Sequence, residues 1–259
     1  MTTLGRFDGK VVLITGAATR IGRATAEHLV QQGAQVLGIG LDGEEGRSLA
    51  AEYASRSLPL LFRETDVTKE SEVLSAIASV MEVYGRLDAV VNCAGMYPTG
   101  KRLEELTDEE WERTIAVNLT SVFRVCRASL PLIRASGGGS VVNIASVHAL
   151  ATVPGVPAYA ATKAAILGLS RQMALDYAVD RIRVNAVLVG SVATRMTLDA
   201  LEAAGGAEAV GLSFEPNKAP RIAQPRELAT AIAFLISEDA AFVTGSGFVV
   251  DGGLTARLL

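Results

Sequence analysis

The chain has 259 residues, a formal charge of −4 at pH 7 and 49% hydrophobic residues. A chain of this length buries enough surface to form a core without disulfides or metals. Its acidic balance argues against non-specific nucleic-acid binding, which needs clustered lysines and arginines, and no apolar run approaches the roughly 18 residues that cross a bilayer. Cys93 and Cys126 lie in apolar runs, and no secretory signal is recognised. We therefore expect a soluble, cytoplasmic protein without nucleic-acid or membrane partners.

Short apolar runs alternate with helical patterns along the whole chain. Strands are expected at 11–14, 35–39, 58–62, 87–92, 140–144, 182–188 and 247–250. Helices are expected at about 21–32, 43–54, 70–84, 108–135, 157–180 and 226–237. Uninterrupted apolar strands separated by helices predict an α/β fold, with a doubly wound, Rossmann-like parallel sheet and helices on both faces. No linker or repeat divides the chain, so we expect a single domain over 1–259.

The segment 195–224 does not fit this alternation. It contains Gly205, Gly206, Gly211, Pro216 and Pro220, and no clear period of apolar residues. A long irregular segment in a compact domain commonly covers a binding site. We therefore predict that 195–224 is a substrate-covering lid.

A glycine-containing turn connects the first strand to the first helix. Gly16 and Gly22 lie in the run Thr-Gly-Ala-Ala-Thr-Arg-Ile-Gly. Glycines let the backbone approach a pyrophosphate closely, and the helix N-terminus offers N–H donors and the positive end of its dipole. Such turns also occur as simple connectors. The position of this one, after a strand and at the start of a helix, favours phosphate binding.

A tyrosine and a lysine share one face of the expected helix 157–180. Tyr159 and Lys163 are four residues apart, which makes them neighbours on a helix. An ammonium group beside a phenol favours the phenolate, so we expect Lys163 to lower the pKa of Tyr159 from about 10. A general acid–base works best when its pKa is near the operating pH. The spacing alone is common by chance, and its context makes it informative.

These motifs together resemble the short-chain dehydrogenase/reductase family, in its short single-domain branch. The resemblance runs from Gly9 to Gly253 and includes the glycine turn, Asn-Cys-Ala-Gly at 92–95 and Tyr-x-x-x-Lys. It implies four catalytic residues, namely Asn118, Ser146, Tyr159 and Lys163. By this resemblance, Ser146 bonds the substrate oxygen, and Asn118 holds a water that relays protons from Lys163. The resemblance also implies a homotetramer, with helices 108–135 and 157–180 packed against their copies.

The resemblance implies a nicotinamide dinucleotide cofactor and a set of residues that bind it. The set is Gly16, Arg20, Ile21, Gly22, Leu41, Asp66, Val67, Asn92, Ala94, Gly95, Tyr159, Lys163, Val192 and Thr194. Asp66 corresponds to the residue that meets the adenine ring, although it is also suited to capping the next helix. Thr194 corresponds to the residue that meets the nicotinamide carboxamide. Arg20 replaces the middle glycine of the turn, where its guanidinium is able to reach the pyrophosphate or a substrate anion, or simply to face solvent.

The choice between NAD and NADP depends on the end of the second strand. Gly40 stands where NAD-binding members of the family usually carry aspartate, and Leu41 stands where NADP-binding members usually carry arginine. The nearest charges are Asp42, Glu44 and Glu45. A 2′-phosphate needs a cation, so these acids favour NAD, with NADP as the alternative.

Ser146, His148 and Tyr159 are the predicted substrate-binding residues. The wording around His148 resembles 3-hydroxybutyrate dehydrogenases, in which a histidine here helps to bind a carboxylate. Val156 stands where such enzymes carry lysine, so a neutral pocket histidine is the competing interpretation. Apolar residues would complete the pocket: Met96, Tyr97, Ala149, Leu150, Val192, Met196 and Leu198.

The sequence thus predicts an oxidoreductase that transfers hydride between a nicotinamide cofactor and an alcohol/ketone pair. Tyr159 is the predicted general acid–base, and no metal site is predicted. The alternative is a catalytically silent protein that senses the dinucleotide. Such a protein should have lost Ser146, Tyr159 or Lys163, and this chain has all three.

Overall fold

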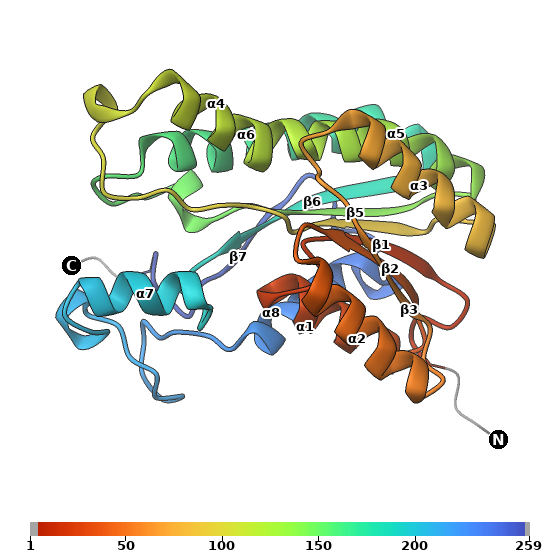
Figure 1. Cartoon of the computed structure of the whole chain (residues 1–259), viewed down its shortest axis with the longest axis horizontal. Helices are drawn as coiled ribbons and strands as arrows, with labels where there is room; N and C mark the ends of the chain where they lie inside the picture. The colour runs from red at the N-terminus through yellow and green to blue at the C-terminus, as the bar shows by residue number, and fades with distance from the viewer. Residues whose placement is uncertain (1–4, 257–259) are drawn as a thin grey trace.

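The computed structural model describes residues 5–256, except the side chain of Met196. Its centre is a parallel sheet in the order β3-β2-β1-β4-β5-β6-β7 (Figure 1). The strands are β1 Val11–Thr15, β2 Gln35–Gly40, β3 Leu60–Glu64, β4 Ala89–Asn92, β5 Gly139–Ile144, β6 Ile182–Val189 and β7 Gly247–Val250. The doubly wound, Rossmann-like sheet expected from the sequence is confirmed.

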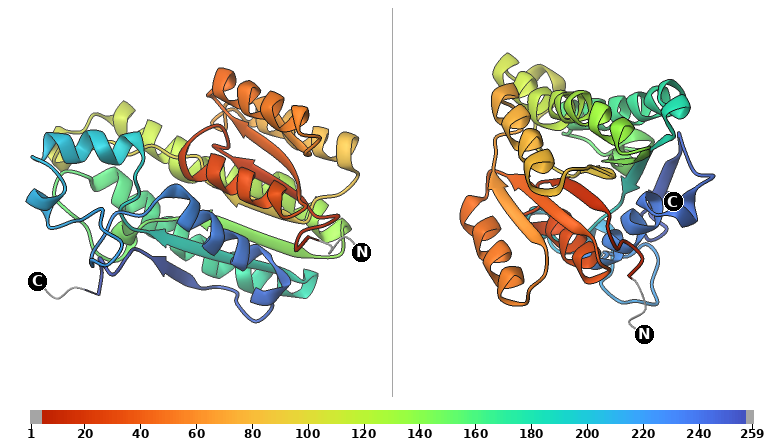
Figure 2. Two further views of the ribbon diagram at one scale, coloured as in Figure 1. Left: turned by 90° about the horizontal axis from the view of Figure 1, so that it is seen from below. Right: turned by 90° about the vertical axis from the view of Figure 1, so that its right-hand side faces the viewer.

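Helices cover both faces of the sheet (Figures 1 and 2). One face carries α3 Glu70–Tyr84, α4 Asp108–Ile115, α5 Ser121–Ala135 and α6 Pro157–Asp176. The other face carries α1 Arg20–Gln31, α2 Gly43–Ser55 and α8 Pro225–Ile236. The sheet is buried on both sides, which explains why its inner strands are apolar without alternation.

The strand order reverses beside β1, and this reversal positions the site. Thr15, the last residue of β1, pairs with Ile39 of β2 on one side and with Asn92 of β4 on the other. The chain leaves β1 and β4 toward opposite faces of the sheet, which opens a crevice outside their carboxyl ends. Ligands of open α/β sheets bind in such a crevice.

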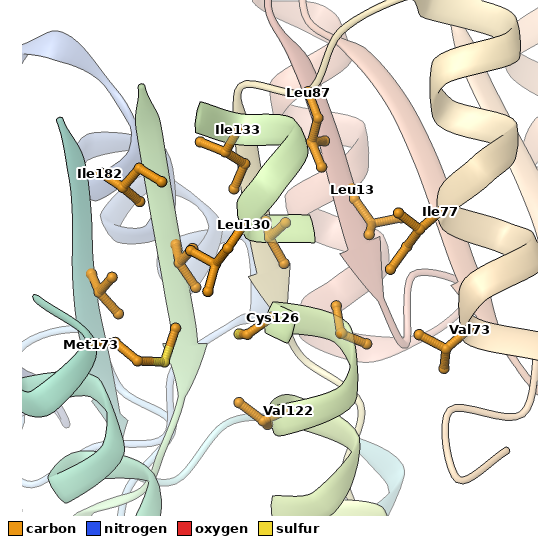
Figure 3. Close-up of a cluster of buried hydrophobic side chains, with 14 of the residues drawn as sticks. Leu13, Val73, Ile77, Leu87, Val122, Cys126, Leu130, Ile133, Met173 and Ile182 are labelled. Carbon is orange, nitrogen blue, oxygen red and sulfur yellow. The ribbon is translucent and has the colours of Figure 1, made fainter. Parts of the chain in front are cut away.

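Each face of the sheet has its own hydrophobic core. The cluster under α3, α5 and α6 includes Leu13, Ile77, Leu130 and Ile133, which point into one shared space in Figure 3. The cluster under α1, α2 and α8 is built around Val12, Ile14 and Val36. Neighbouring residues of β1 thus serve opposite cores, as the period-two geometry of a strand requires.

Three elements differ from the sequence expectation. The segment 195–224 is not irregular throughout, because it begins with the helix α7, Arg195–Ala203. The expected helix 108–135 is divided into α4 and α5 by a π-helical turn at Ala116–Thr120. The expected helix 157–180 ends at Asp176 and is followed by a short 3₁₀ turn.

Two features of the described residues bear on ligands and location. Within residues 5–256, no helix is long and apolar enough to span a membrane. In the same part of the chain, no three His, Cys, Asp or Glu side chains gather as a metal site would require. Cys93 and Cys126 are free thiols.

Candidate active site

A cleft of about 270 Å³ lies at the carboxyl edge of the sheet. Most of the predicted cofactor residues line it: Gly16, Arg20, Ile21, Leu41, Asp66, Val67, Ala94, Gly95, Tyr159, Lys163, Val192 and Thr194. The catalytic candidate Ser146 also lines the cleft. Gly22, Asn92, Asn118 and His148 lie outside the lining and contribute in other ways.

The glycine turn is as tight as a phosphate-binding turn must be. A Cβ added to Gly22 would lie 2.1 Å from the carbonyl oxygen of Gly16, so no other residue fits there. Gly16 has a φ of +65°, in the left-handed region that glycine enters without strain. Gly22 therefore lets the helix start pack against the backbone of Gly16, and Gly16 lines the cleft. The turn fits the pyrophosphate of a dinucleotide by its backbone alone.

Arg20 has an unusual backbone for a residue with a side chain. Its φ is +57°, which explains why the family pattern has glycine at this place. The residue is exposed and lines the cleft. Its guanidinium is also close enough to the Cys93 thiol to act on the pKa of that group. Arg20 therefore lies over the cleft rather than away from it.

Thr15 organises the floor of the cleft, a role that the sequence reading did not assign. Its hydroxyl oxygen accepts hydrogen bonds of 2.9 Å from the backbone N–H groups of Cys93 and Ala94. The signal was present, because Thr15 precedes the first glycine of the turn. Asn92, by contrast, donates to Asn143 at 2.8 Å within the buried sheet, so its side chain supports the strands rather than the cleft wall.

Asp66 forms its own turn at the adenosine end of the cleft. Its Oδ1 accepts hydrogen bonds from the backbone N–H of Thr68 at 2.9 Å and from the Thr68 hydroxyl at 2.6 Å. Burial alone would raise the pKa of Asp66, but these hydrogen bonds hold it below its usual value. The N-cap of α3 is Lys69, so Asp66 does not cap that helix itself. Asp66 remains charged on the cleft wall.

The end of β2 is bordered by the carboxylate of Asp42 and by an ion pair between Arg47 and Glu64. Leu41 is 63% exposed beside the cleft, and Asp42 lines it without giving a side-chain cap to α2. Arg47 donates to Glu64 at 2.9 Å, so its charge is already compensated. Asp42 and the exposed Arg20 both add charge to the lining of the cleft.

Tyr159 and Ser146 meet at the inner end of the cleft. The Ser146 hydroxyl lies close enough to act on the pKa of Tyr159, while it donates to the Val189 carbonyl oxygen at 3.3 Å. Burial nevertheless raises the pKa of Tyr159 to about 12, and the nearby Ser146 hydroxyl offsets only part of this rise. The expectation that Lys163 lowers the pKa of Tyr159 is therefore wrong for this structure, because burial outweighs every other influence.

Lys163 is hydrogen-bonded to the backbone and lies over the Tyr159 ring. Its Nζ donates to the carbonyl oxygen of Ile144 at 2.7 Å and lies 5.5 Å from the centre of the Tyr159 ring. Lys163 is 5% exposed, and burial lowers its pKa from 10.5 to about 8. The neighbouring Cys93 opposes this shift slightly. Lys163 is thus a buried ammonium group whose charge is disfavoured by desolvation and whose hydrogen-bond partner is a neutral carbonyl oxygen.

Asn118 lies on the π-helical turn and is completely buried. Its Oδ1 accepts from the Met96 N–H at 2.8 Å, and its Nδ2 donates to the Met96 carbonyl at 3.0 Å. A third contact, of 3.3 Å, joins Nδ2 to Thr162 Oγ1. The side-chain amide is therefore engaged mainly with the backbone after β4, and the role of Asn118 in a proton relay from Lys163 stays a prediction. π-Turns within α-helices frequently mark functional positions.

His148 packs against the ring of Tyr159 and is not on the cleft wall itself. Their ring centroids are 5.5 Å apart and nearly perpendicular. Burial lowers the pKa of His148, and its Nδ1 lies 2.9 Å from Thr152 Oγ1. A neutral imidazole is a poor partner for a carboxylate, so the environment favours the neutral-pocket interpretation.

The remaining predicted pocket residues are divided. Thr194 is the N-cap of α7, with its hydroxyl accepting from the Thr197 N–H at 3.4 Å, and it also lines the cleft. Met96 and Val192 line the cleft, whereas Leu150 and Leu198 are largely exposed. The side chain of Met196 lies outside the described residues.

Comparison with known proteins gives the same family as the motifs. A family model described as enoyl-(acyl carrier protein) reductase matches residues 16–255. A cyclopentanol dehydrogenase from a Comamonas strain is 38% identical over 254 residues, covering 98% of this chain and 100% of that protein. A cyclohexanol dehydrogenase from an Acinetobacter strain is 35% identical over 252 residues, covering 97% of each.

The solved structures agree with these relatives. The structure of a short-chain type dehydrogenase/reductase from Mycobacterium ulcerans matches with a TM-score of 0.89 and 30% identity, covering 97% of this chain and 91% of that one. The chain belongs to the short-chain dehydrogenase/reductase family. It is an oxidoreductase of alcohol/ketone pairs that uses a nicotinamide cofactor.

Proposed function

We propose that the protein is an NAD-dependent dehydrogenase of small neutral secondary alcohols, with Tyr159 as its general acid–base. The observation that carries the proposal is the proximity of Tyr159 and Ser146 at the inner end of the cleft that the glycine turn lines. The similar proteins named for cyclopentanol and cyclohexanol support a small alcohol without a charged group.

The proposed chemistry divides between the cofactor and the chain. The nicotinamide, when bound, supplies or accepts the hydride. Ser146 and Tyr159 bond the substrate oxygen, and Tyr159 takes the alcohol proton during oxidation or returns it during reduction. Lys163 lies beneath the tyrosine, so its charge favours the phenolate whenever that form arises. Because Tyr159 holds its proton at neutral pH, it can donate that proton directly in ketone reduction, whereas alcohol oxidation requires that the phenol first release its proton to solvent.

The proposed cofactor site uses the residues that line the cleft. Backbone groups of the turn at Gly16 receive the pyrophosphate, with Arg20 above it. Asp66 borders the adenine, and Thr194 borders the carboxamide. Asp42 supports NAD over NADP, because its carboxylate would repel a 2′-phosphate and Arg47 is paired with Glu64.

Three further expectations belong to the same proposal. The segment 195–224, including α7, serves as the substrate-covering lid. The protein forms a homotetramer in which exposed apolar residues of α5 and α6, such as Phe123 and Leu175, are covered by a second copy. The free thiols Cys93 and Cys126 suit the reducing cytoplasm.

Absorbance at the nicotinamide band tests the proposal. Purified protein is assayed with NAD or NADP and a panel of cyclopentanol, cyclohexanol and short linear secondary alcohols. We expect turnover of neutral alcohols with a higher kcat/KM for NAD. Tight NADH binding without turnover of any alcohol or ketone would support a dinucleotide sensor instead. Turnover of an enoyl thioester but no alcohol would contradict the proposed substrate class.

A further inference from the structure

Two aromatic rings besides the catalytic candidate form a packed cluster around it. Tyr97 lies edge-on to Tyr159, with ring centroids 4.6 Å apart and an interplanar angle of 83°. His148 lies 5.5 Å from Tyr159 at 80°, and 5.7 Å from Tyr97 at 56°. Perpendicular pairs at these distances are the favoured arrangement of aromatic rings. Tyr97 comes from the loop after β4 and His148 from the turn after β5, so the cluster joins two strand ends.

Buried hydrogen bonds fix the position of Tyr97. The residue before it, Met96, has its N–H and its carbonyl oxygen bonded to the side chain of Asn118. Asn118 is completely buried on the π-helical turn and also contacts Thr162, which lies next to Lys163 on α6. These contacts give the Asn118 amide a positioning role: it holds the loop that carries Tyr97 against α6.

The two added rings are uncharged. Burial lowers the pKa of His148. Thr152 Oγ1 donates to the Val153 carbonyl at 3.4 Å, so it accepts from Nδ1–H of His148, and the other ring nitrogen is an unprotonated acceptor. No described residue bonds the Tyr97 hydroxyl, and burial raises the pKa of that phenol.

Charge in this region is otherwise paired or bonded to the backbone. Lys101 lies 2.5 Å from Glu110, Arg195 lies 3.8 Å from Asp199, and Lys163 donates to the carbonyl oxygen of Ile144. An anionic substrate packed against the two added rings would therefore lose hydration there without gaining a counterion from either ring, which is costly in a partly buried site.

We propose that Tyr97, together with His148, forms a neutral aromatic wall that selects compact cyclic alcohols over linear and anionic ones. The proposal rests on the proposed function, since it concerns the substrate of the same site. A saturated ring presents a flat face of C–H groups to an aromatic wall without losing rotational freedom. A linear alcohol must freeze several bonds to make the same contact. Tyr97 is thus a specificity-determining residue, and Asn118 is a positioning residue that acts through Met96.

The test compares kcat/KM for cyclohexanol and 2-hexanol, two alcohols with the same number of carbons. In Tyr97→Ala we expect cyclohexanol to lose about tenfold or more while 2-hexanol changes little, so that the ratio falls toward one. Tyr97→Phe keeps the ring and should retain the ratio of the unchanged protein. The KM for the cofactor should remain the same, because Tyr97 does not line the dinucleotide cleft. Leu74→Ala, at an exposed site on α3, is the control for apolar truncation.

The outcomes separate this proposal from the broader one. If the unchanged protein oxidises alcohols and Tyr97→Ala keeps the preference for cyclohexanol, only the proposal of an aromatic wall is overturned. Loss of the ratio in Tyr97→Phe overturns it too, because the hydroxyl would then be the selecting group. Faster turnover of 3-hydroxybutyrate than of cyclohexanol contradicts the neutral wall. An unchanged protein that oxidises no alcohol overturns both proposals. If Tyr97→Ala does not fold, Tyr97→Leu replaces it with the same expected ratio.

Discussion

The two ends of the sheet each have a cavity, and they differ in how their polar groups are satisfied. The cavity at the amino edge is the larger, about 500 Å³, and five cations line it: Arg6, Lys10, Arg86, Arg181 and Arg183. Arg183 donates to the carbonyl oxygens of Leu235 at 2.7 Å and Ser237 at 2.9 Å, at the end of α8. Arg183 thus complements the negative end of α8, while Arg6, Lys10 and Arg86 pair with carboxylates.

The carboxyl edge has fewer charges but less complete compensation. There Lys163 is buried with a carbonyl oxygen as its partner, and its pKa falls to about 8. Tyr159 has a pKa raised to about 12 in the same cleft. Functional sites are where burial moves pKa values apart, whereas dense but paired charge serves stability. The comparison supports the proposal that the smaller cavity is the site of chemistry.

The largest expected effect is that of Lys163→Met. Turnover should fall by about a thousandfold, because the cation beneath Tyr159 is lost. The free energy of unfolding, in contrast, should rise in this variant. At pH 7, below both the folded pKa of about 8 and the ordinary value of 10.5, the ammonium is charged in both states. Its burial then costs about 3 kcal/mol, and the bond to Ile144 returns about 1 kcal/mol.

Urea unfolding of Lys163→Met without added cofactor should therefore give a free energy of unfolding about 2 kcal/mol higher than that of the unchanged protein. A variant that is both inactive and less stable would show that the lysine is held without strain, and the contrast between the two edges would weaken.

At the amino edge, Asp88→Ala should lower the stability of the protein and leave its turnover unchanged, in contrast to Lys163→Met. Asp88 is 6% exposed and accepts from the Val11 N–H at 2.9 Å and from Arg86 at 2.7 Å. Its removal leaves a buried donor and a cation unpaired, so we expect a loss of about 3 kcal/mol. Below its lowered melting temperature, the variant should keep its KM for cofactor and its kcat. Altered kinetics with intact stability would break the division between the edges.

The pH dependence of ketone reduction sharpens the comparison further. The folded pKa of Lys163 is about 8, so the ammonium loses its proton above that pH, while Tyr159 keeps its own until about 12. The rate of reduction should be level below pH 8 and fall about tenfold by pH 9 or slightly above. A rate that stays level through pH 10 would show that the Lys163 charge is not needed.

Arg20→Gly gives the smallest expected effect. Glycine relieves the left-handed backbone at φ +57°, which should raise the free energy of unfolding by up to about 1 kcal/mol. The lost guanidinium should weaken NADH binding about fivefold, as expected for an exposed charge pair. Arg20→Lys serves as the control that keeps the charge. Fluorescence titration with NADH measures the cofactor affinity of both variants. Unchanged affinity in the glycine variant would show that Arg20 does not contact the phosphates.

The parts that the sequence predicted well depend on local pattern. Apolar runs gave the strands and their burial, and the run at 15–22 gave the turn, because glycine spacing directly encodes a close backbone approach. The helix α7 was missed because its pattern is weak: among its described side chains Leu201 alone is buried, and Thr194 caps its N-terminus. The left-handed backbone conformation of Arg20 was not predicted from the sequence either.

The parts that were wrong depend on tertiary burial. The sequence placed Tyr159 and Lys163 as neighbours, but the pKa of each follows from how completely the fold encloses it. Asn118 was named from the family resemblance, yet only the fold brings Met96 to its amide. Position along a helix is local information, whereas desolvation and hydrogen-bond partners are not.

The most direct measurement pairs binding with turnover in Tyr159→Phe. This change removes one hydroxyl group and keeps the ring that packs against Tyr97 and His148. We predict NADH affinity close to that of the unchanged protein and a kcat lower by about a thousandfold with cyclopentanol or cyclohexanol. A Phe variant that binds NADH and retains most of its turnover would contradict the assignment of Tyr159 as the proton donor and acceptor.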